Sequence, residues 1–139
     1  MPKPPLPDEL QTILRKPNPC VIATVGPDGA PRTAATWYEW LDDGTVLLNM
    51  DESRRRLPHM RRNPHVGLTV LDGESWYRQI SLLGTVRDIH RDPDLEDIDR
   101  LSRHYTDRPY RDRSRRSWTA IVGVERWSAW DRGHLYTVR

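Results

Sequence analysis

The sequence alternates short apolar runs with tight-turn segments, and this spacing constrains the fold more than any other feature. "CVIATV" at residues 20–25 is followed by "GPDG", whose residues favour turns, and "PRTAATWYEWL" at 31–41 returns as a second run. "DDG" at 42–44 then leads into "TVLLNM" at 45–50. The pattern predicts three consecutive antiparallel strands.

The second half of the chain continues the strand pattern. Residues 65–89 predict two strands around the Asp72-Gly73 turn, with Gly84 marking a bulge, and residues 118–130 predict a final strand. Helical spacing of apolar residues predicts two short helices, at residues 7–16 and 92–106. Ser53 as a cap, Pro58 in a first turn and the stop signal "NP" at 63–64 predict a third near residues 56–62. Six strands without alternating helices predict a mainly β protein, a closed or nearly closed antiparallel barrel.

The length and composition fit a single globular domain spanning residues 1–139. The sequence contains no P-loop, dinucleotide-binding glycine fingerprint, zinc-ligand spacing or nucleophile elbow, and we expect no metal site. Cys20 is the only cysteine, so we expect a buried, inert thiol in a cytoplasmic protein. We expect no signal peptide and no membrane span, since the first residues lack the charged-then-apolar pattern and no apolar run approaches the roughly 20 residues that a span requires.

The segment "DESRRRLPHMRRNPH" at residues 51–65 contains five arginines, although the formal net charge of the chain is only +2. The cluster has three interpretations. The first is a solvated face paired with Asp51 and Glu52, and the second is a nucleic-acid surface, which so small a net charge steers weakly. The third is a phosphate site at a junction between strand and helix, where free backbone amides of the helix and the side chains of Arg54 and Arg56 bind one anion together.

Two aromatic clusters are ambiguous from the sequence alone. In "TWYEW" strand alternation sends Trp37 and Tyr38 to opposite faces, so one of the two is expected in the core. Trp76 and Tyr77 stand beside a predicted turn, where an aromatic pair can cover a flat ligand or pack against the protein.

An ordered set of segments resembles the pyridoxamine 5′-phosphate oxidase-like split β-barrel family, and within it the branch that uses the deazaflavin coenzyme F420 instead of FMN. The segments are "CVIATVGPDGAPRTAATWYEW", "VLLNMDESRRRLPHMRRNPHVGLTV", "ISLLGTVRDI", "LSRHYTDRPY" and "ERWSAW". The resemblance implies a six-stranded split β-barrel of the FMN-binding type. It also implies a homodimer with cofactor sites at the subunit interface.

The resemblance also implies roles for individual residues. Arg54 and Arg56 would hold the cofactor phosphate, Asn49 would contact the ring system or its linker, and Arg61 and Arg62 would face the acidic oligoglutamate tail of F420. Three residues would run alongside the tricyclic ring: Ala35, Thr36 and Trp37. Three more would come from the neighbouring strand pair or from the other subunit: Trp76, Tyr77 and Gln79.

The implied activity is hydride transfer from reduced F420 to a flat, conjugated small molecule. No residue is assigned to catalysis, and a proton would come from solvent or from Tyr38 or Tyr77. Two alternatives remain open at this point. One is an FMN-binding oxidase or reductase of the same fold, and the other is a non-enzymatic flavin or deazaflavin carrier. We expect no nucleic-acid and no membrane partner.

Overall fold

A computed structural model describes residues 1–137. Over these residues the elements are α1 (Asp8–Leu14), β1 (Cys20–Val25), β2 (Pro31–Thr36), β3 (Glu39–Trp40), β4 (Thr45–Asp51), α2 (Arg56–Arg62), β5 (His65–Asp72), β6 (Ser75–Arg91), α3 (Glu96–Thr106), β7 (Ser117–Asp131) and β8 (His134–Leu135). The three helices lie where the sequence predicts them, and α1 and α3 are shorter than the predicted segments.

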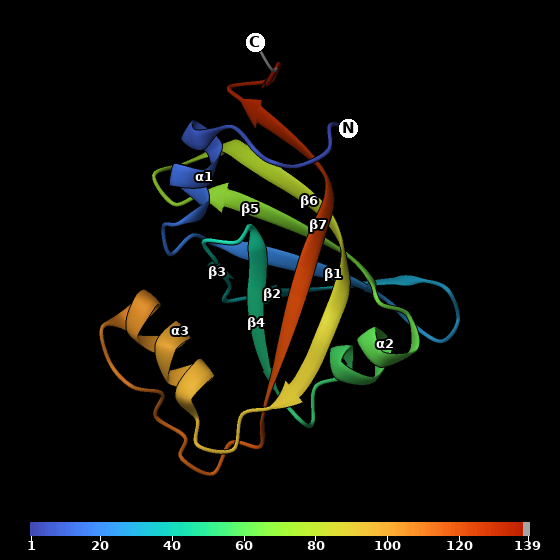
Figure 1. Ribbon diagram of the computed structural model, residues 1–139, viewed down its shortest axis with the longest axis vertical. Coiled ribbons are helices and arrows are strands. Elements are labelled where there is room, and N and C mark those ends of the chain that lie inside the picture. The colour runs from blue at the N-terminus through green and yellow to red at the C-terminus, as the bar shows by residue number, and fades with distance from the viewer. Residues whose placement is uncertain (138–139) are drawn as a thin grey trace.

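The strands form one antiparallel sheet in the order β2-β1-β5-β6-β7-β4-β3, with β8 paired to β7. The outermost strands β2 and β3 are separated in the chain by only Trp37 and Tyr38. Because three Cα steps reach at most about 11 Å, the sheet must roll until its two edges approach each other (Figure 1). The predicted mainly β, antiparallel split barrel is therefore confirmed.

The predicted strand at 31–41 is divided into β2 and β3, which is one reason why the number of strands differs from six. The break occurs where Tyr38 turns into the core and is 0% exposed. The Tyr38 hydroxyl donates a hydrogen bond to the Leu14 carbonyl oxygen at 2.7 Å and accepts one from the Asn18 amide at 3.0 Å. The expectation that Trp37 or Tyr38 is a core residue is confirmed for Tyr38.

Two long strands join the two halves of the barrel. β6 pairs with β5 from Ser75 to Thr85 and with β7 along most of its length, while β7 also pairs with β4. The register between β6 and β7 shifts at Leu83/Gly84, which confirms the predicted bulge. A Cβ atom on Gly84 would lie 2.5 Å from the Gly123 carbonyl oxygen, so the two backbones approach closely here.

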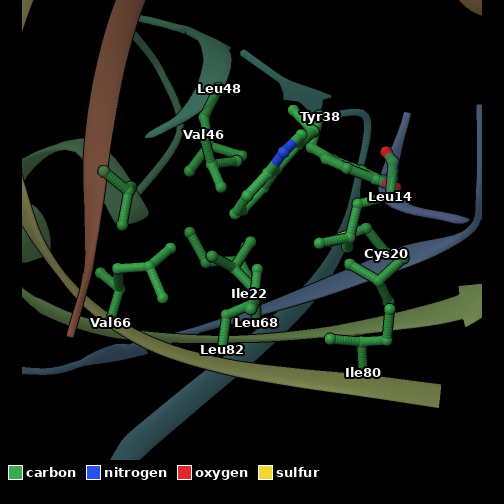
Figure 2. Packing of buried hydrophobic residues seen from close by; sticks show 14 of the residues in the cluster. Leu14, Cys20, Ile22, Tyr38, Val46, Leu48, Val66, Leu68, Ile80 and Leu82 are labelled. Atoms are coloured by element: carbon green, nitrogen blue, oxygen red, sulfur yellow. The ribbon is translucent and has the colours of Figure 1, made fainter. Parts of the chain in front are cut away.

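The barrel interior is filled by alternating residues of the strands, closed by residues of α1 and α2 (Figure 2). Representative members are Leu14, Cys20, Ile22, Val46, Leu48, Leu57, Met60, Val66, Leu68, Ile80 and Leu82. β4 is covered on both faces, because Leu47 on its outer face packs in a second cluster with Ile98 and Leu101 of α3. Helices α2 and α3 therefore flank the end of β4 (Figure 1).

We predict that Gly84→Ala lowers the free energy of unfolding by about 1–3 kcal/mol, because the new methyl group must push the β6 and β7 backbones apart. Its Cβ would also meet Val122 Cγ1 at 2.7 Å. The control is Gly73→Ala in the β5–β6 turn, where the nearest atom is 3.6 Å away and a change of less than about 0.5 kcal/mol is expected. Denaturant titration measures both, and equal effects would contradict the close approach.

Candidate anion- and ring-binding site

Two adjoining cavities open between β1, β2, α2 and α3. The larger, about 660 Å³, contains the aromatic side chains described below and is called the aromatic cavity. The smaller, about 490 Å³, lies between the β1–β2 hairpin and α2 and is called the basic cavity. Ala34, Arg54 and Arg56 line both cavities and form the border between them.

The aromatic cavity has walls suited to a flat ring. Trp37 stacks on Tyr105 of α3 with ring centroids 5.2 Å apart and meets the edge of Tyr110 at 6.2 Å. The Tyr105 hydroxyl donates to the Asn18 carbonyl oxygen at 2.6 Å, and burial raises the pKa of Tyr105 above its usual value. A neutral, aromatic surface of this kind binds planar conjugated molecules.

Three guanidinium groups line the aromatic cavity, and those of Arg54 and Arg56 stand at its border with the basic cavity. Arg54 and Arg56 come from the junction of β4 and α2, and Arg115 comes from the loop before β7. None of the three pairs with a carboxylate within residues 1–137. Burial, followed by the charges of Arg54 and Arg115, lowers the pKa of Arg56. Three like charges with no internal counterion form a site for an external anion.

Asn49 lies on the outer face of β4 and is 4% exposed. Its Oδ1 atom accepts hydrogen bonds from Arg115 Nε at 3.2 Å and Nη2 at 3.1 Å and from Ser117 Oγ at 3.0 Å. Its Nδ2 atom donates to Asp92 Oδ2 at 3.4 Å and to Thr119 Oγ1 at 3.2 Å. The side chain therefore uses its hydrogen-bonding capacity inside the protein.

The junction of β4 and α2 supplies Arg54 and Arg56 but few free backbone amides. It has seven residues, and the amides of Leu57 and His59 already donate to the carbonyl oxygens of Arg54 and Arg55. The sequence interpretation expected free amides at this junction to share the anion. The guanidinium groups are therefore the main donors that the junction offers.

Six of the eleven predicted site residues meet around the aromatic cavity: Ala35, Thr36, Trp37, Asn49, Arg54 and Arg56. Arg61 and Arg62 line neither cavity, and the Arg61 guanidinium lies 4.5 Å over the Trp118 ring. Trp76, Tyr77 and Gln79 also line neither cavity of the single chain. Trp76 and Tyr77 stack on each other at 4.5 Å and are 61% and 58% exposed.

Sequence reasoning missed several lining residues. In the aromatic cavity these are Tyr105, Tyr110 and Arg115, and in the basic cavity they are Arg32, Arg55 and His59. The segment at 107–117 reads as a polar loop, and its interleaved tyrosine and arginines were the only available signal. The His59 Nδ1 atom contacts Thr24 Oγ1 at 3.3 Å, and both residues line the basic cavity.

Tyr38 is not placed to donate a proton to a ligand. It lines neither cavity, and its hydroxyl donates to the Leu14 carbonyl oxygen in the core. Cys20 is the inert thiol that the sequence predicts. It is 3% exposed, and burial raises the pKa of its thiol to about 12. Within residues 1–137 no cluster of three metal-ligating side chains occurs, and no helix combines the length and apolar character that crossing a bilayer requires.

A family model and the curated relatives of this chain indicate the same family. The family model for pyridoxamine 5′-phosphate oxidase matches residues 6–131. A pyridoxine/pyridoxamine 5′-phosphate oxidase from Porphyromonas gingivalis is 32% identical over 112 residues, which cover 78% of this chain and 47% of that protein. The chain thus spans about half the length of the curated relatives it matches.

Solved structures agree with this family. One described as an F420 reductase is 27% identical with a TM-score of 0.80, and the match covers 88% of this chain and 98% of that chain. A conserved hypothetical protein from Mycobacterium tuberculosis is 22% identical with a TM-score of 0.73, covering 99% and 93% of the two chains. The second likeness supports the fold alone.

Proposed function

Because the chain belongs to the pyridoxamine 5′-phosphate oxidase family, we propose that it is a reductase that transfers a hydride from reduced coenzyme F420 to a flat, conjugated small molecule. The family is one of oxidoreductases. One observation carries the proposal: arginines without carboxylate partners stand at the border of a cavity walled by aromatic rings. The likeness to a structure described as an F420 reductase adds support.

The residues fit a phosphorylated, ring-bearing cofactor. Arg54 and Arg56 would hold the phosphate, while Trp37, with Ala35 and Thr36 beside it on β2, would lie along the ring. Bound in its reduced form, the coenzyme supplies the hydride, and the chain supplies orientation and electrostatics. Among its described lining residues the aromatic cavity has no Asp, Glu or His, so we propose that solvent provides the proton.

The surplus of positive charge favours F420 over FMN. FMN presents one phosphate, whereas F420 also carries an acidic oligoglutamate tail. The basic cavity adds Arg55 to the two border arginines. Its fourth arginine, Arg32, forms an ion pair with Asp28 at 3.0 Å. We propose that the tail crosses the basic cavity past Arg55 and continues toward Arg61 and Arg62 on α2.

FMN binding by the same border arginines is the second candidate. It is favoured by the curated relatives, which are pyridoxine/pyridoxamine 5′-phosphate oxidases. A non-enzymatic carrier would bind the same cofactors without turnover. Direct comparison of binding and turnover separates the three functions.

The outer face of the sheet favours a homodimer. Val21 of β1 is 36% exposed and Leu83 of β6 is 46% exposed, and they flank Gly67 and Thr69 of β5 in register. A flat face of small and apolar side chains is typical of a subunit interface. We propose that two chains associate here, and that the second copy contributes three residues to each cofactor site: Trp76, Tyr77 and Gln79.

We expect Arg54→Ala and Arg56→Ala each to weaken F420 binding by about 1.5–3 kcal/mol, because each removes a charged hydrogen bond to the phosphate. The melting temperature of the cofactor-free protein should change little. Calorimetric titration with F420 and FMN side by side measures the affinities, with Arg103→Ala on α3 as the control. Tighter binding of FMN would favour the second candidate, and unaltered affinity in both variants would exclude the phosphate assignment.

If Arg55, Arg61 and Arg62 contact the oligoglutamate tail, their contribution to affinity should disappear when the coenzyme lacks its glutamates. Arg55→Ala, and Arg61 and Arg62 changed together to Ala, should each weaken binding of intact F420 about two- to fivefold, as exposed ion pairs do. The same variants should bind a coenzyme truncated before its first glutamate with wild-type affinity. Equal losses for both coenzymes would place the tail elsewhere.

The dimer proposal predicts that Leu83→Glu gives a monomer, because a buried carboxylate at the interface would have no partner. Light scattering coupled to size-exclusion chromatography measures the mass. Thr12→Glu is the control, since Thr12 is exposed on α1 and belongs to none of the strands that form this face. A monomeric wild-type chain that binds cofactor with full affinity would overturn the shared-site proposal.

A further inference from the structure

We propose that Arg115 is a third anion-binding residue and that Asn49 is a positioning residue, which holds the Arg115 guanidinium in the wall of the aromatic cavity without neutralising its charge. The inference rests on the proposed function only in naming the anion as the cofactor phosphate. It gives Asn49 a role that differs from direct contact with the ring.

The Arg115 guanidinium is fixed on the cavity wall although it belongs to a loop. Its Nε and Nη2 atoms both donate to Asn49 Oδ1, and its Nη1 atom donates to the Tyr110 hydroxyl at 3.0 Å. Its Cζ atom lies 4.7 Å from the centroid of the Tyr110 ring. These contacts immobilise a long side chain before any ligand arrives, so less entropy is lost on binding.

None of these contacts cancels the charge. The acceptors are an amide oxygen, a phenol oxygen and a ring face, and Arg115 forms no ion pair within the described residues 1–137. A guanidinium has about five N–H groups, so the three bonds to Asn49 and Tyr110 leave donors for a ligand. The positive charge of Arg115 acts on Arg56, which places the two guanidinium groups in the same electrostatic neighbourhood.

The orientation of the Asn49 amide is set by the buried carboxylate of Asp92. Asp92 accepts the backbone amides of Asp97 at 3.0 Å and Ile98 at 3.1 Å, which ties it to the first turn of α3. Its Oδ2 atom also accepts the Asn49 Nδ2 group. The amide nitrogen of Asn49 therefore faces Asp92, and the amide oxygen must face Arg115. The reverse orientation would set N–H groups against a guanidinium.

A neutral residue at position 49 is needed for this arrangement. An aspartate there would pair with Arg115 and remove the charge that attracts the anion. It would also stand beside Asp92, which would place two buried carboxylates in contact. Asparagine fixes the guanidinium through the same geometry and adds no charge.

The test is a double-mutant cycle with inorganic pyrophosphate, FMN and F420 as separate probes. We expect Arg115→Gln to weaken pyrophosphate binding about tenfold, as loss of a charged hydrogen bond does, and Asn49→Ala to weaken it similarly. The double variant should be no weaker than either single variant by more than about twofold, because both changes remove one interaction. Arg116→Gln is the control, since Arg116 pairs with Glu52 at 2.9 Å and should bind as the wild type does.

The Nε–Hε resonance of Arg115 gives a second readout that needs no cofactor and no turnover. In the wild type it should be protected from exchange and should shift when pyrophosphate is added, and in Asn49→Ala the protection should be lost. Unchanged affinity in Arg115→Gln, additive effects in the cycle, or an unprotected wild-type resonance would each overturn the inference. If Asn49→Ala unfolds, Arg115→Gln and the resonance decide.

The probes separate this inference from the proposed function. Weak F420 binding together with pyrophosphate or FMN binding that depends on Arg115 would remove the deazaflavin proposal and support the inference. A wild-type protein that binds F420 but shows no dependence on Arg115 would do the reverse. Absence of any pyrophosphate binding would also overturn the inference.

Discussion

The burial of Tyr38 is the constraint on which the rest of the structure depends. Its hydroxyl joins the carbonyl oxygen of Leu14, at the end of α1, to the interior of the barrel, and its ring is fully enclosed. Because Tyr38 points inward, the strand is interrupted and β2 and β3 become the two edges of the rolled sheet. Its neighbour Trp37 points the other way and stacks on Tyr105, which builds the wall of the aromatic cavity. One inward side chain thus links barrel closure to the site.

The arginines that line the aromatic cavity illustrate how a fold can hold like charges close together. Among the described residues, the Arg56 guanidinium donates hydrogen bonds only to neutral oxygens, those of the Thr36 hydroxyl and the Asn49 backbone, at 3.5 and 3.4 Å. Arg115 likewise rests on an amide and a phenol. Elsewhere in the chain, arginines such as Arg113 pair closely with carboxylates. Neutral partners hold the guanidinium groups in place and leave their charge available, at some cost to the stability of the ligand-free protein.

The sequence predicted the features that follow from local rules. Strand alternation placed most strands, and the Gly84 bulge followed from a glycine within a long strand, where two backbones approach. Arg54 and Arg56 were predicted as phosphate ligands because they stand at a junction between strand and helix, and the fold brings both to the border of the two cavities. The interruption at Tyr38 could not be predicted, since its burial and the hydrogen bonds of its hydroxyl with Leu14 and Asn18 are tertiary contacts. Arg115 was missed because only the docking of α3 brings its loop to β4.

The two long strands have a consequence for how the protein melts. β6 and β7 are hydrogen-bonded to each other through most of their length and to different neighbours on either side, so neither half of the barrel has a complete set of backbone partners alone. Unfolding should therefore be all-or-none, and ligand binding at the end of β4 should stabilise the distant β5–β6 hairpin by the same free energy. The shift of a single melting temperature would then report ligand binding at the cavities, so candidate acceptors and cofactors can be ranked by that shift.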